Sequence, residues 1–281
     1  MTSTRKSPAS AVRPKKHLGQ HFLRDLTVAD RIAESVVTAA EIPLLEVGPG
    51  TGALTRPLID KGRRNLEVVE IDRDSVAFLR EQDWFREAGV MLHEGDMLKW
   101  KAAEWADVAS GGKFSIVGNF PYNISSQILF RALDQGERIV ELTGMFQKEV
   151  AERVCAPSGN KVYGILSVLM QTYFDCAYLF TVDEGAFDPP PKVKSGVIRC
   201  VRKPADQIHS SPTPAHLALV VKAAFNLRRK TLRNALRAAN LDFSAVDETT
   251  LGLRAEALTV EGFLDLARKI PDQRSTTKRN G

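Results

Sequence analysis

The chain has 281 residues, of which 43% are hydrophobic and 26% charged, a composition typical of an ordinary globular protein. No apolar run approaches the roughly 18 residues that span a bilayer, and Met1–Arg24 lacks the apolar core of a secretory signal. Cys155, Cys176 and Cys200 lack the spacing of disulfide partners or metal ligands, so we expect a cytoplasmic protein with no membrane association and no bound metal. The formal net charge of +5 favours a polyanionic partner.

Helix and strand patterns alternate through the first half of the chain. In order, they predict a helix at 27–40, a strand at 43–47, a helix ending near Lys61, a strand at 66–71, a helix at 74–82, strands at 90–93 and 114–118, a helix at 124–133 and a strand at 139–146. Strands that alternate with helices of this length predict an α/β protein with a doubly wound, mainly parallel sheet.

The pattern changes in the second half. An apolar helix is expected at 163–173, and strands at 174–182 and 196–201 flank a proline-rich loop. Strand signals then stop, and three helical stretches remain near 213–225, 228–239 and 259–269. We therefore expect a flexible basic arm at 1–16, the α/β domain at 17–205, a small all-helical domain at 206–270 and a flexible tail at 271–281.

A glycine-rich segment, Glu46–Ala53, follows the first expected strand and opens a helix, and three interpretations of it compete. A phosphate-binding loop of the Walker type is rejected because the segment continues as Gly-Ala-Leu rather than Gly-Lys-Ser/Thr. The dinucleotide fingerprint is formally matched by Gly48, Gly50 and Ala53. The E-x-G-x-G-x-G loop of S-adenosylmethionine (SAM)-dependent methyltransferases also uses Gly52 and the initial glutamate, which a nicotinamide site does not require.

Acidic residues follow the next two strands. Glu70 could accept hydrogen bonds from both hydroxyls of a ribose, and Asp96 could accept one from an adenine amino group. Each also has a purely structural alternative, since Asp96 in a Gly-Asp pair is a common helix N-cap and Glu70 could be a solvent-facing acid. Because the carboxyl ends of parallel strands share one crevice, the acids together point to a nucleotide-like ligand.

The fourth expected strand ends in Asn-Phe-Pro-Tyr. Pro121 fixes its own φ and pushes Phe120 out of the helical region, so the chain turns rigidly here. Such a turn would hold the Asn119 amide, a backbone carbonyl and the Tyr122 ring around one small volume. These groups can grip a planar base and accept hydrogen bonds from its exocyclic amine. Taken alone, a proline turn with a core tyrosine is the simpler interpretation, but beside the glycine loop the turn favours a methyltransferase over a dehydrogenase.

Further motifs occur in order along the chain: Leu18–Leu23 (LGQHFL), Glu70–Asp72, Asn119–Ser125 (NFPYNIS), Gln147–Glu149, Tyr163–Ser167, Phe187–Val193 (FDPPPKV) and Ala224–Lys230 (AFNLRRK). On these motifs and the glycine loop, the chain from Lys16 to about Ile270 resembles the ribosomal RNA adenine N6-dimethyltransferases. That family modifies two adjacent adenosines near the 3′ end of small-subunit ribosomal RNA. His21 and Phe120 stand where the family commonly has Asn and Leu.

The resemblance implies a Rossmann-like SAM-methyltransferase domain with SAM as its cofactor. The cofactor-binding residues would be His21, Leu23, Gly48, Glu70, Asp96 and Asn119. The catalytic residues would be Asn119, Pro121 and Tyr122, with no metal and no covalent protein nucleophile. His21 and Leu23 would close over SAM, and Asn119 would sit between the cofactor and the target base.

A basic face is expected in the helical domain, because Arg229, Arg233 and Arg237 recur at i, i+4 and i+8 with Arg228 and Lys230 alongside. Such a face suits an RNA backbone, although an ordinary solvated helix is about as compatible with the pattern. The basic arm and further basic residues favour RNA; these are Lys192, Lys194 and Arg199.

The expected partner is 16S ribosomal RNA within an immature small subunit, bound by a monomer. Two rival functions stay open. One is methylation of a large-subunit adenosine that confers antibiotic resistance, and the other is a ribosome-assembly factor that acts mainly by binding. The proline-rich loop and the segment 226–230 favour the small-subunit enzyme.

Overall fold

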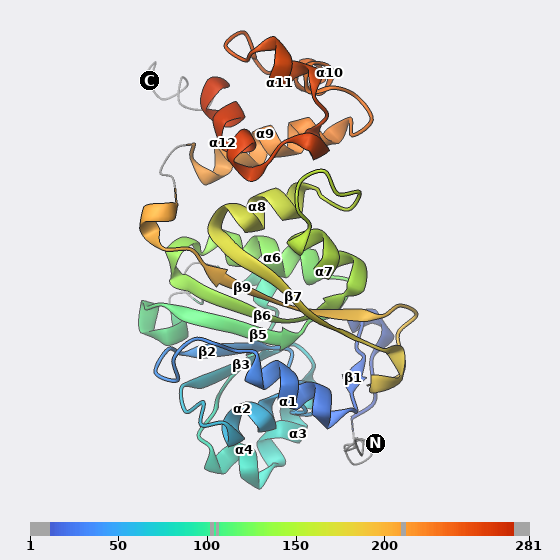
Figure 1. Cartoon of the computed structure of the whole chain (residues 1–281). Coiled ribbons are helices and arrows are strands. Elements are labelled where there is room, and N and C mark those ends of the chain that lie inside the picture. The colour runs from blue at the N-terminus through green and yellow to red at the C-terminus, as the bar shows by residue number, and fades with distance from the viewer. Residues whose placement is uncertain (1–11, 102–103, 105–106, 209–211, 273–281) are drawn as a thin grey trace. The chain divides into compact units, whose positions relative to one another are not determined.

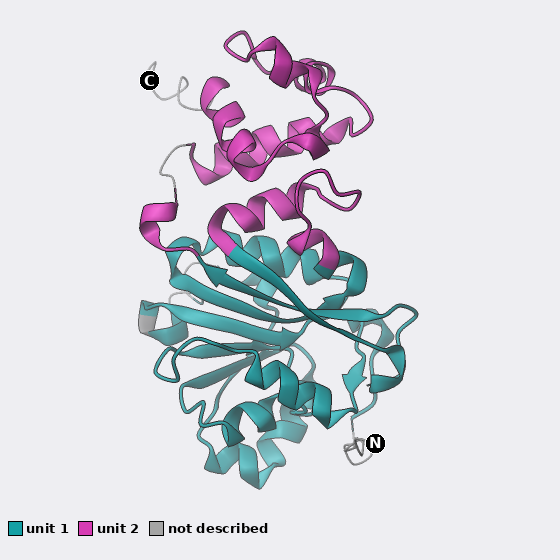
Figure 2. Ribbon diagram, in the orientation of Figure 1, with its two compact units in different colours: residues 1–151, 175–202 teal, residues 152–174, 203–281 magenta. Residues whose placement is uncertain are grey.

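The computed structural model describes residues 12–101, 104, 107–208 and 212–272, and the chain forms two compact units (Figures 1 and 2). The first unit contains residues up to 151 together with 175–202. The second contains 152–174 and the chain from 203 onward. The sequence placed a boundary only near residue 205, whereas the segment 152–174 groups with the helical unit because its helix packs on the helices that follow residue 203.

A seven-stranded sheet in the order β4-β3-β2-β5-β6-β9-β7 forms the centre of the first unit. Its strands are β2 (Leu44–Val47), β3 (Leu66–Glu70), β4 (Met91–Glu94), β5 (Phe114–Asn119), β6 (Ile139–Gln147), β7 (Phe174–Val182) and β9 (Ser195–Arg202). Neighbours from β4 to β6 are parallel, and β9 runs antiparallel to β6. The expected α/β class with a mainly parallel sheet is confirmed.

Helices cover both faces of this sheet, with α1, α2 and α3 on one face and α6 on the other (Figure 1). The helices of the first unit are α1 (Leu26–Glu34), α2 (Thr55–Asp60), α3 (Arg73–Glu81), α4 (Asp83–Glu87) and α6 (Ser125–Asp134), and α7 (Lys148–Cys155) ends in the second unit. Side chains such as Ile32, Leu58 and Leu79 pack against Val68 and Val117 of the sheet. This apolar packing makes the sheet a rigid platform for the loops at its strand ends.

Helix α1 ends six residues earlier than the sequence predicted. It ends at Glu34, and Ser35 N still donates to carbonyls of the helix. The N–H groups of residues 37 and 38 are instead bound by a side chain from a distant strand. Val37 N and Thr38 N donate to the buried Glu141 carboxylate over 3.1 and 2.7 Å. Because a buried carboxylate needs hydrogen-bond donors, this contact outweighs the helical pattern of residues 35–40.

A short antiparallel ribbon, which the sequence did not reveal, joins β1 (Phe22–Leu23) to β8 (Phe187–Asp188). It places the N-terminal segment beside the proline-rich loop, because Phe22 pairs with Asp188, which is 166 positions later in the sequence. Two residues per strand carry no recognisable alternation, so the sequence offers no signal for such a ribbon.

The second unit is helical. Its helices are α8 (Ile165–Tyr173), α9 (Pro214–Asn226), α10 (Leu232–Ala238), α11 (Glu248–Gly252) and α12 (Val260–Lys269). Helix α9 begins with the Thr213 side chain capping a backbone N–H and a proline in its first turn, and it packs on α8, α10 and α12. In the part of the chain that the structure describes, no helix is long and apolar enough to cross a membrane.

The helix expected at 228–239 begins only at Leu232. Thr231 is extended, with φ −68° and ψ 159°, and pairs with Arg254 in an isolated antiparallel bridge. Arg229 therefore lies in the turn before α10, and the expectation that it shares one helical face with Arg233 and Arg237 is wrong. A backbone pairing with a segment more than twenty residues away sets where this helix begins.

Candidate active site

A cavity of about 260 Å³ opens at the carboxyl ends of β2, β3, β4 and β5. Five segments line it: the N-terminal residues 17–23, the glycine loop, the end of β3, the loop after β4 and the turn after β5. The predicted cofactor-binding and catalytic residues all lie on this wall; they are His21, Leu23, Gly48, Glu70, Asp96, Asn119, Pro121 and Tyr122. The structure thus brings together residues that are up to 101 positions apart in the chain.

The glycine loop adopts the conformation that its glycines allow. Gly48, Gly50 and Gly52 have φ values of +70°, +57° and +83°, which side-chain-bearing residues rarely adopt. At Gly52 a Cβ atom would lie 2.6 Å from the Trp84 ring, whereas at Gly48 it would meet nothing within 4 Å. Gly52 is therefore required for packing, and Gly48 leaves open space beside the backbone where a ligand can approach.

Glu70 is held at the cavity wall by backbone donors. Its carboxylate accepts hydrogen bonds from Gly50 N, Ile71 N and Asp72 N over 2.9, 2.8 and 2.9 Å. Burial raises the pKa of Glu70, and the three backbone donors oppose that shift. Since each carboxylate oxygen can accept more than one hydrogen bond, this fixed group keeps acceptor capacity for ligand hydroxyls.

Asp96 has the structural role that the sequence offered as its alternative. Its Oδ1 accepts from Leu98 N over 3.0 Å and caps a short 3-10 helix, Met97–Lys99. The other oxygen, Oδ2, lies 3.7 Å from the exposed Lys99 ammonium. The cap orients the carboxylate at the cavity wall and occupies only one of its oxygens, so the capping role and a ligand-binding role are compatible.

Glu46 is a buried acid in the same wall. It is 1% exposed, and burial raises its pKa to about 8. Among the described residues its Oε2 atom has no hydrogen-bond partner. An unpartnered buried oxygen costs free energy unless a ligand satisfies it. The hydroxyl of Thr55 opposes the rise in pKa, so the surroundings of Glu46 within the protein are partly polar.

Asn119 occupies the end of β5 and is tied to the N-terminal segment. Its Nδ2 donates to the backbone carbonyl of His21 over 3.0 Å, which directs Oδ1 elsewhere. The following residue, Phe120, is 1% exposed, and its ring lies 4.7 Å from that of Phe146. Since Phe120 N also donates to Met145 O, the turn is fixed by packing and by a backbone bond.

Tyr122 presents its ring beside that of His21, with the ring centroids 5.5 Å apart. Its hydroxyl forms a hydrogen bond with the buried hydroxyl of Ser195 at the start of β9. His21 Nδ1 lies 2.7 Å from the carbonyl oxygen of Pro189. Both aromatic rings are therefore held by partners on the proline-rich loop and its following strand.

Sequence reasoning missed the residues that hold the site together. Ser195 was not singled out, and Lys15 entered only as part of the basic arm at 1–16. Gln20 and Asp72 entered only as members of motifs. The feature of the sequence that could have pointed to Gln20 and Asp72 is their place inside the segments LGQHFL and EID. Nothing in the local pattern indicates that these two segments touch.

Comparisons with known proteins identify the family of this chain. A family model described as ribosomal RNA adenine dimethylase matches residues 11–270. The chain belongs to this family. It is 46% identical over 260 residues to "Ribosomal RNA small subunit methyltransferase A" of Cytophaga hutchinsonii, covering 92% of this chain and 98% of the relative. It is 48% identical over 256 residues to the protein of the same name in Porphyromonas gingivalis, covering 91% and 96%.

Solved structures give a broader likeness. The 23S rRNA methyltransferase ErmE is 26% identical with a TM-score of 0.67, covering 88% of this chain and 98% of that one. A dimethyladenosine transferase from Plasmodium falciparum has a TM-score of 0.71 at 22% identity, covering 88% and 96%, and this likeness concerns the fold. This dimethylase-family chain therefore shares the methyltransferase fold and depends on SAM.

The predicted RNA-binding residues lie in the second unit and fall into two groups. Arg228 pairs with Glu256 over 3.2 Å and donates to two backbone carbonyls, while Arg233 pairs with the Glu248 carboxylate. The others are exposed; they are Arg229, Lys230 and Arg237. The first group has structural partners, and the second presents its charges to solvent.

Proposed function

We propose that this protein uses SAM to dimethylate the exocyclic N6 of two adjacent adenosines in the 3′-terminal hairpin of 16S ribosomal RNA. The observation that carries the proposal is a single cavity that combines a glycine loop and acids suited to SAM with the Asn119–Tyr122 turn suited to an adenine. Membership of the ribosomal RNA adenine dimethylase family supports both the cofactor and the base.

The cofactor half of the cavity binds by charge and by hydrogen bonds. Glu70 accepts from the ribose hydroxyls and Asp96 Oδ2 accepts from the adenine amine. Glu46, which also lines the cavity, lies beside the ammonium group. His21 and Leu23 close this half from the N-terminal side. SAM supplies an electrophilic methyl group on a sulfonium that is already an excellent leaving group.

The target nitrogen is a poor nucleophile because its lone pair is delocalised into the purine ring. Asn119 Oδ1 has no hydrogen-bond partner among the described residues, and it accepts one of the two N6 hydrogens. The backbone carbonyl of Phe120 or Pro121 accepts the other. These two contacts favour a pyramidal nitrogen whose lone pair faces the methyl group, so positioning provides most of the rate enhancement.

Tyr122 holds the base in this orientation by stacking. A base stacked on an aromatic side chain gains about 1–3 kcal/mol. This gain offsets part of the stacking energy that the adenine loses when it leaves the base stack of the RNA. The bond to Ser195 and the neighbouring His21 ring limit the movement of Tyr122. The ring is therefore in place before the base arrives.

The substrate choice rests on the relatives. Two relatives at 46% and 48% identity carry a small-subunit name, whereas the 23S rRNA methyltransferase is 26% identical. We therefore favour the small-subunit target over the resistance-type methylase. We also propose a cytoplasmic monomer that acts on an immature small subunit, with Arg229, Lys230 and Arg237 in contact with RNA phosphates.

Primer extension on ribosomal RNA from a strain that lacks the gene tests this proposal. Two adjacent unmodified adenosines near the 3′ end of 16S RNA, restored by the wild-type gene and not by Asn119→Ala, are the expected result. Loss of a methyl group from 23S RNA instead would establish the rival target. An unchanged methylation pattern together with defective subunit assembly would favour the assembly-factor alternative.

A further inference from the structure

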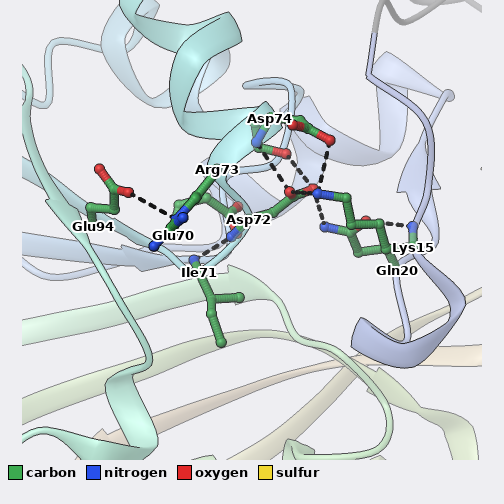
Figure 3. A network of polar contacts seen from close by, with 9 residues as sticks. Lys15, Gln20, Glu70, Ile71, Asp72, Arg73, Asp74 and Glu94 are labelled. Carbon is green, nitrogen blue, oxygen red and sulfur yellow. Dashed lines mark hydrogen bonds and ion pairs between the residues drawn. The ribbon is translucent and has the colours of Figure 1, made fainter.

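The N-terminal residues 15–23, here called the strap, contact both halves of the cavity. At one end, Lys15 and Gln20 reach the loop that follows β3 (Figure 3). At the other end, the His21 carbonyl accepts from Asn119, and Phe22 pairs with Asp188. The two ends are therefore fastened by separate contacts, one on the cofactor side and one on the base side.

The contact on the cofactor side converges on one buried carboxylate. The Asp72 side chain is fully buried, and it accepts from Lys15 Nζ over 2.5 Å and from Gln20 Nε2 over 3.0 Å. Gln20 Oε1 in turn accepts from Lys15 N over 2.8 Å. Lys15 and Gln20 thus support each other. Together with Asp74 N and Ser75 Oγ of α3, which also donate to Asp72, they satisfy a buried acid.

Asp72 also belongs to the loop that presents Glu70. Asp72 N donates to Glu70 Oε1, and Gly50 N donates to Glu70 Oε2. A continuous series of bonds therefore runs from the strap through Asp72 to Glu70 (Figure 3). The bond from Gly50 N extends it to the glycine loop. Burial alone would raise the pKa of Asp72, but the hydrogen bonds from Lys15 and Gln20 hold it below its usual range.

We propose that Lys15, Gln20 and Asp72 form a latch that holds the strap over the bound cofactor, so that these three are positioning residues for SAM. The inference rests on the proposed function, since it assigns the latch to the SAM half of that site. Gln20 lines the cavity, but Lys15 does not. Lys15 shares the Asp72 carboxylate with Gln20, and it also pairs with the exposed Asp74 over 2.8 Å, so it fastens the strap to the start of α3 as well.

The latch has a specific kinetic consequence. The base side of the strap keeps its own contacts when the latch is opened, so Asn119 and Tyr122 stay in place. SAM, however, escapes more readily from a strap that is open for a larger fraction of the time. Breaking the latch should therefore raise the dissociation constant and the KM for SAM while leaving kcat near its wild-type value.

Lys15→Met tests the latch, and Lys61→Met is its matched control. Lys61 pairs with Glu34 over 2.9 Å, its side chain is 35% exposed against 33% for Lys15, and it lies outside the cavity. Calorimetry and stopped-flow dissociation measure SAM binding without RNA, and steady-state methylation of immature small subunits gives kcat and KM. We expect Lys15→Met to raise the SAM dissociation constant and KM by about threefold to tenfold, with kcat within about twofold.

Further variants make the result specific. Lys15→Arg, which keeps a cation, should restore most of the affinity, and Lys61→Met should bind SAM like the wild type. Gln20→Met should weaken SAM binding in the same direction, and adding Lys15→Met to Asp72→Asn should cost less than the sum of the single changes. Thermal unfolding of each variant shows whether the protein is folded, and Gln20→Met serves if Lys15→Met is not.

Each outcome separates the two proposals. Wild-type protein that failed to bind SAM would overturn the proposed function and the latch together. Wild-type protein that binds SAM and methylates RNA, beside Lys15→Met and Gln20→Met variants with unchanged SAM affinity, would overturn the latch alone. A loss confined to kcat would also overturn it, because the strap would then act on the base side.

Discussion

The side-chain amide of Asn119 donates to the backbone carbonyl of His21 over 3.0 Å, across 98 residues of sequence. This bond decides which way the amide faces, because only the Nδ2 atom can donate. Oδ1 is left without a hydrogen-bond partner among the described residues, on a side chain that lines the cavity. The strap therefore orients a residue of the base half by a backbone atom, which no substitution of the His21 side chain removes.

Replacing Asn119 by Ala should abolish most methyl transfer without unfolding the protein. Loss of one oriented polar contact to the reacting group lowers kcat by about 100-fold or more. Methylation of immature subunits at saturating SAM and RNA measures this loss. Asn65→Ala is the matched control, since Asn65 makes the same kind of bond to Glu41 O over 3.1 Å away from the cavity. Wild-type turnover by Asn119→Ala would refute the assigned role.

Tyr122→Ala should lower methyl transfer by more than Tyr122→Phe. Alanine removes the stacking surface, worth about 1–3 kcal/mol, whereas phenylalanine removes only the bond to Ser195. Single-turnover kinetics with an RNA hairpin compares the two variants. Ser195→Ala should resemble Tyr122→Phe, and the double variant should be no worse than either single one. Equal losses for Tyr122→Ala and Tyr122→Phe would show that the hydroxyl matters and the ring surface does not.

Asp96→Ser should weaken SAM binding by about 1–3 kcal/mol, the cost of one unmade hydrogen bond at a buried ligand group. Serine keeps the N-cap that Asp96 provides to Leu98 N, so folding should be preserved. Calorimetry with SAM measures the change. Asp247→Ser, which alters an equivalent N-cap of α11, is the control and should bind SAM normally. Unaltered affinity in Asp96→Ser would leave Asp96 with its capping role alone.

Glu46 should make the stability of the cofactor-free protein depend on pH. Its pKa is raised from 4.5 to about 8, so its contribution is fully present below pH 4.5 and is lost as the pH rises toward 8. Glutamine cannot titrate, so the unfolding free energy of Glu46→Gln should not fall in this way. Its advantage over the wild type should grow by about 1–3 kcal/mol as the pH rises from 6 to 8. Urea unfolding across this range gives the difference. If the difference in unfolding free energy between the two proteins did not vary with pH, Glu46 would not be a buried acid that is protonated in the folded state.

Removing the exposed charges of the second unit should weaken RNA binding. Changing Arg229, Lys230 and Arg237 together to Gln removes exposed cations that RNA phosphates can contact. The salt dependence of binding should flatten by about 0.7–0.9 per lost phosphate contact, because fewer counterions are released. Filter binding across a salt series measures the slope, and SAM affinity should not change.

Arg228 and Arg233 serve as the comparison for that experiment. They already pair with Glu256 and Glu248, so their replacement should affect the stability of the second unit as well as RNA binding. If the exposed triple variant binds RNA like the wild type at every salt concentration, the RNA is held elsewhere on the protein.

The sequence by itself determined the sheet and the wall of the cavity. Strands such as β2 and β5 and the glycine loop follow from local apolar runs and from turn residues that permit positive φ. Parallel strands end at one edge, so residues that follow successive strands must meet there. That is why Glu70, Asp96 and Asn119 could be assigned to one site before any coordinates were known.

Only the tertiary structure decided what holds that site in place. Lys15 and Asp72 are 57 residues apart, Tyr122 and Ser195 are 73 apart, and Glu141 reaches back 104 residues to end α1. A local pattern reports the preference of a segment for helix or strand, but it contains no information about which distant side chain will supply a missing donor or acceptor. Buried polar groups must nevertheless find such partners, and the path of the whole chain determines which ones they find.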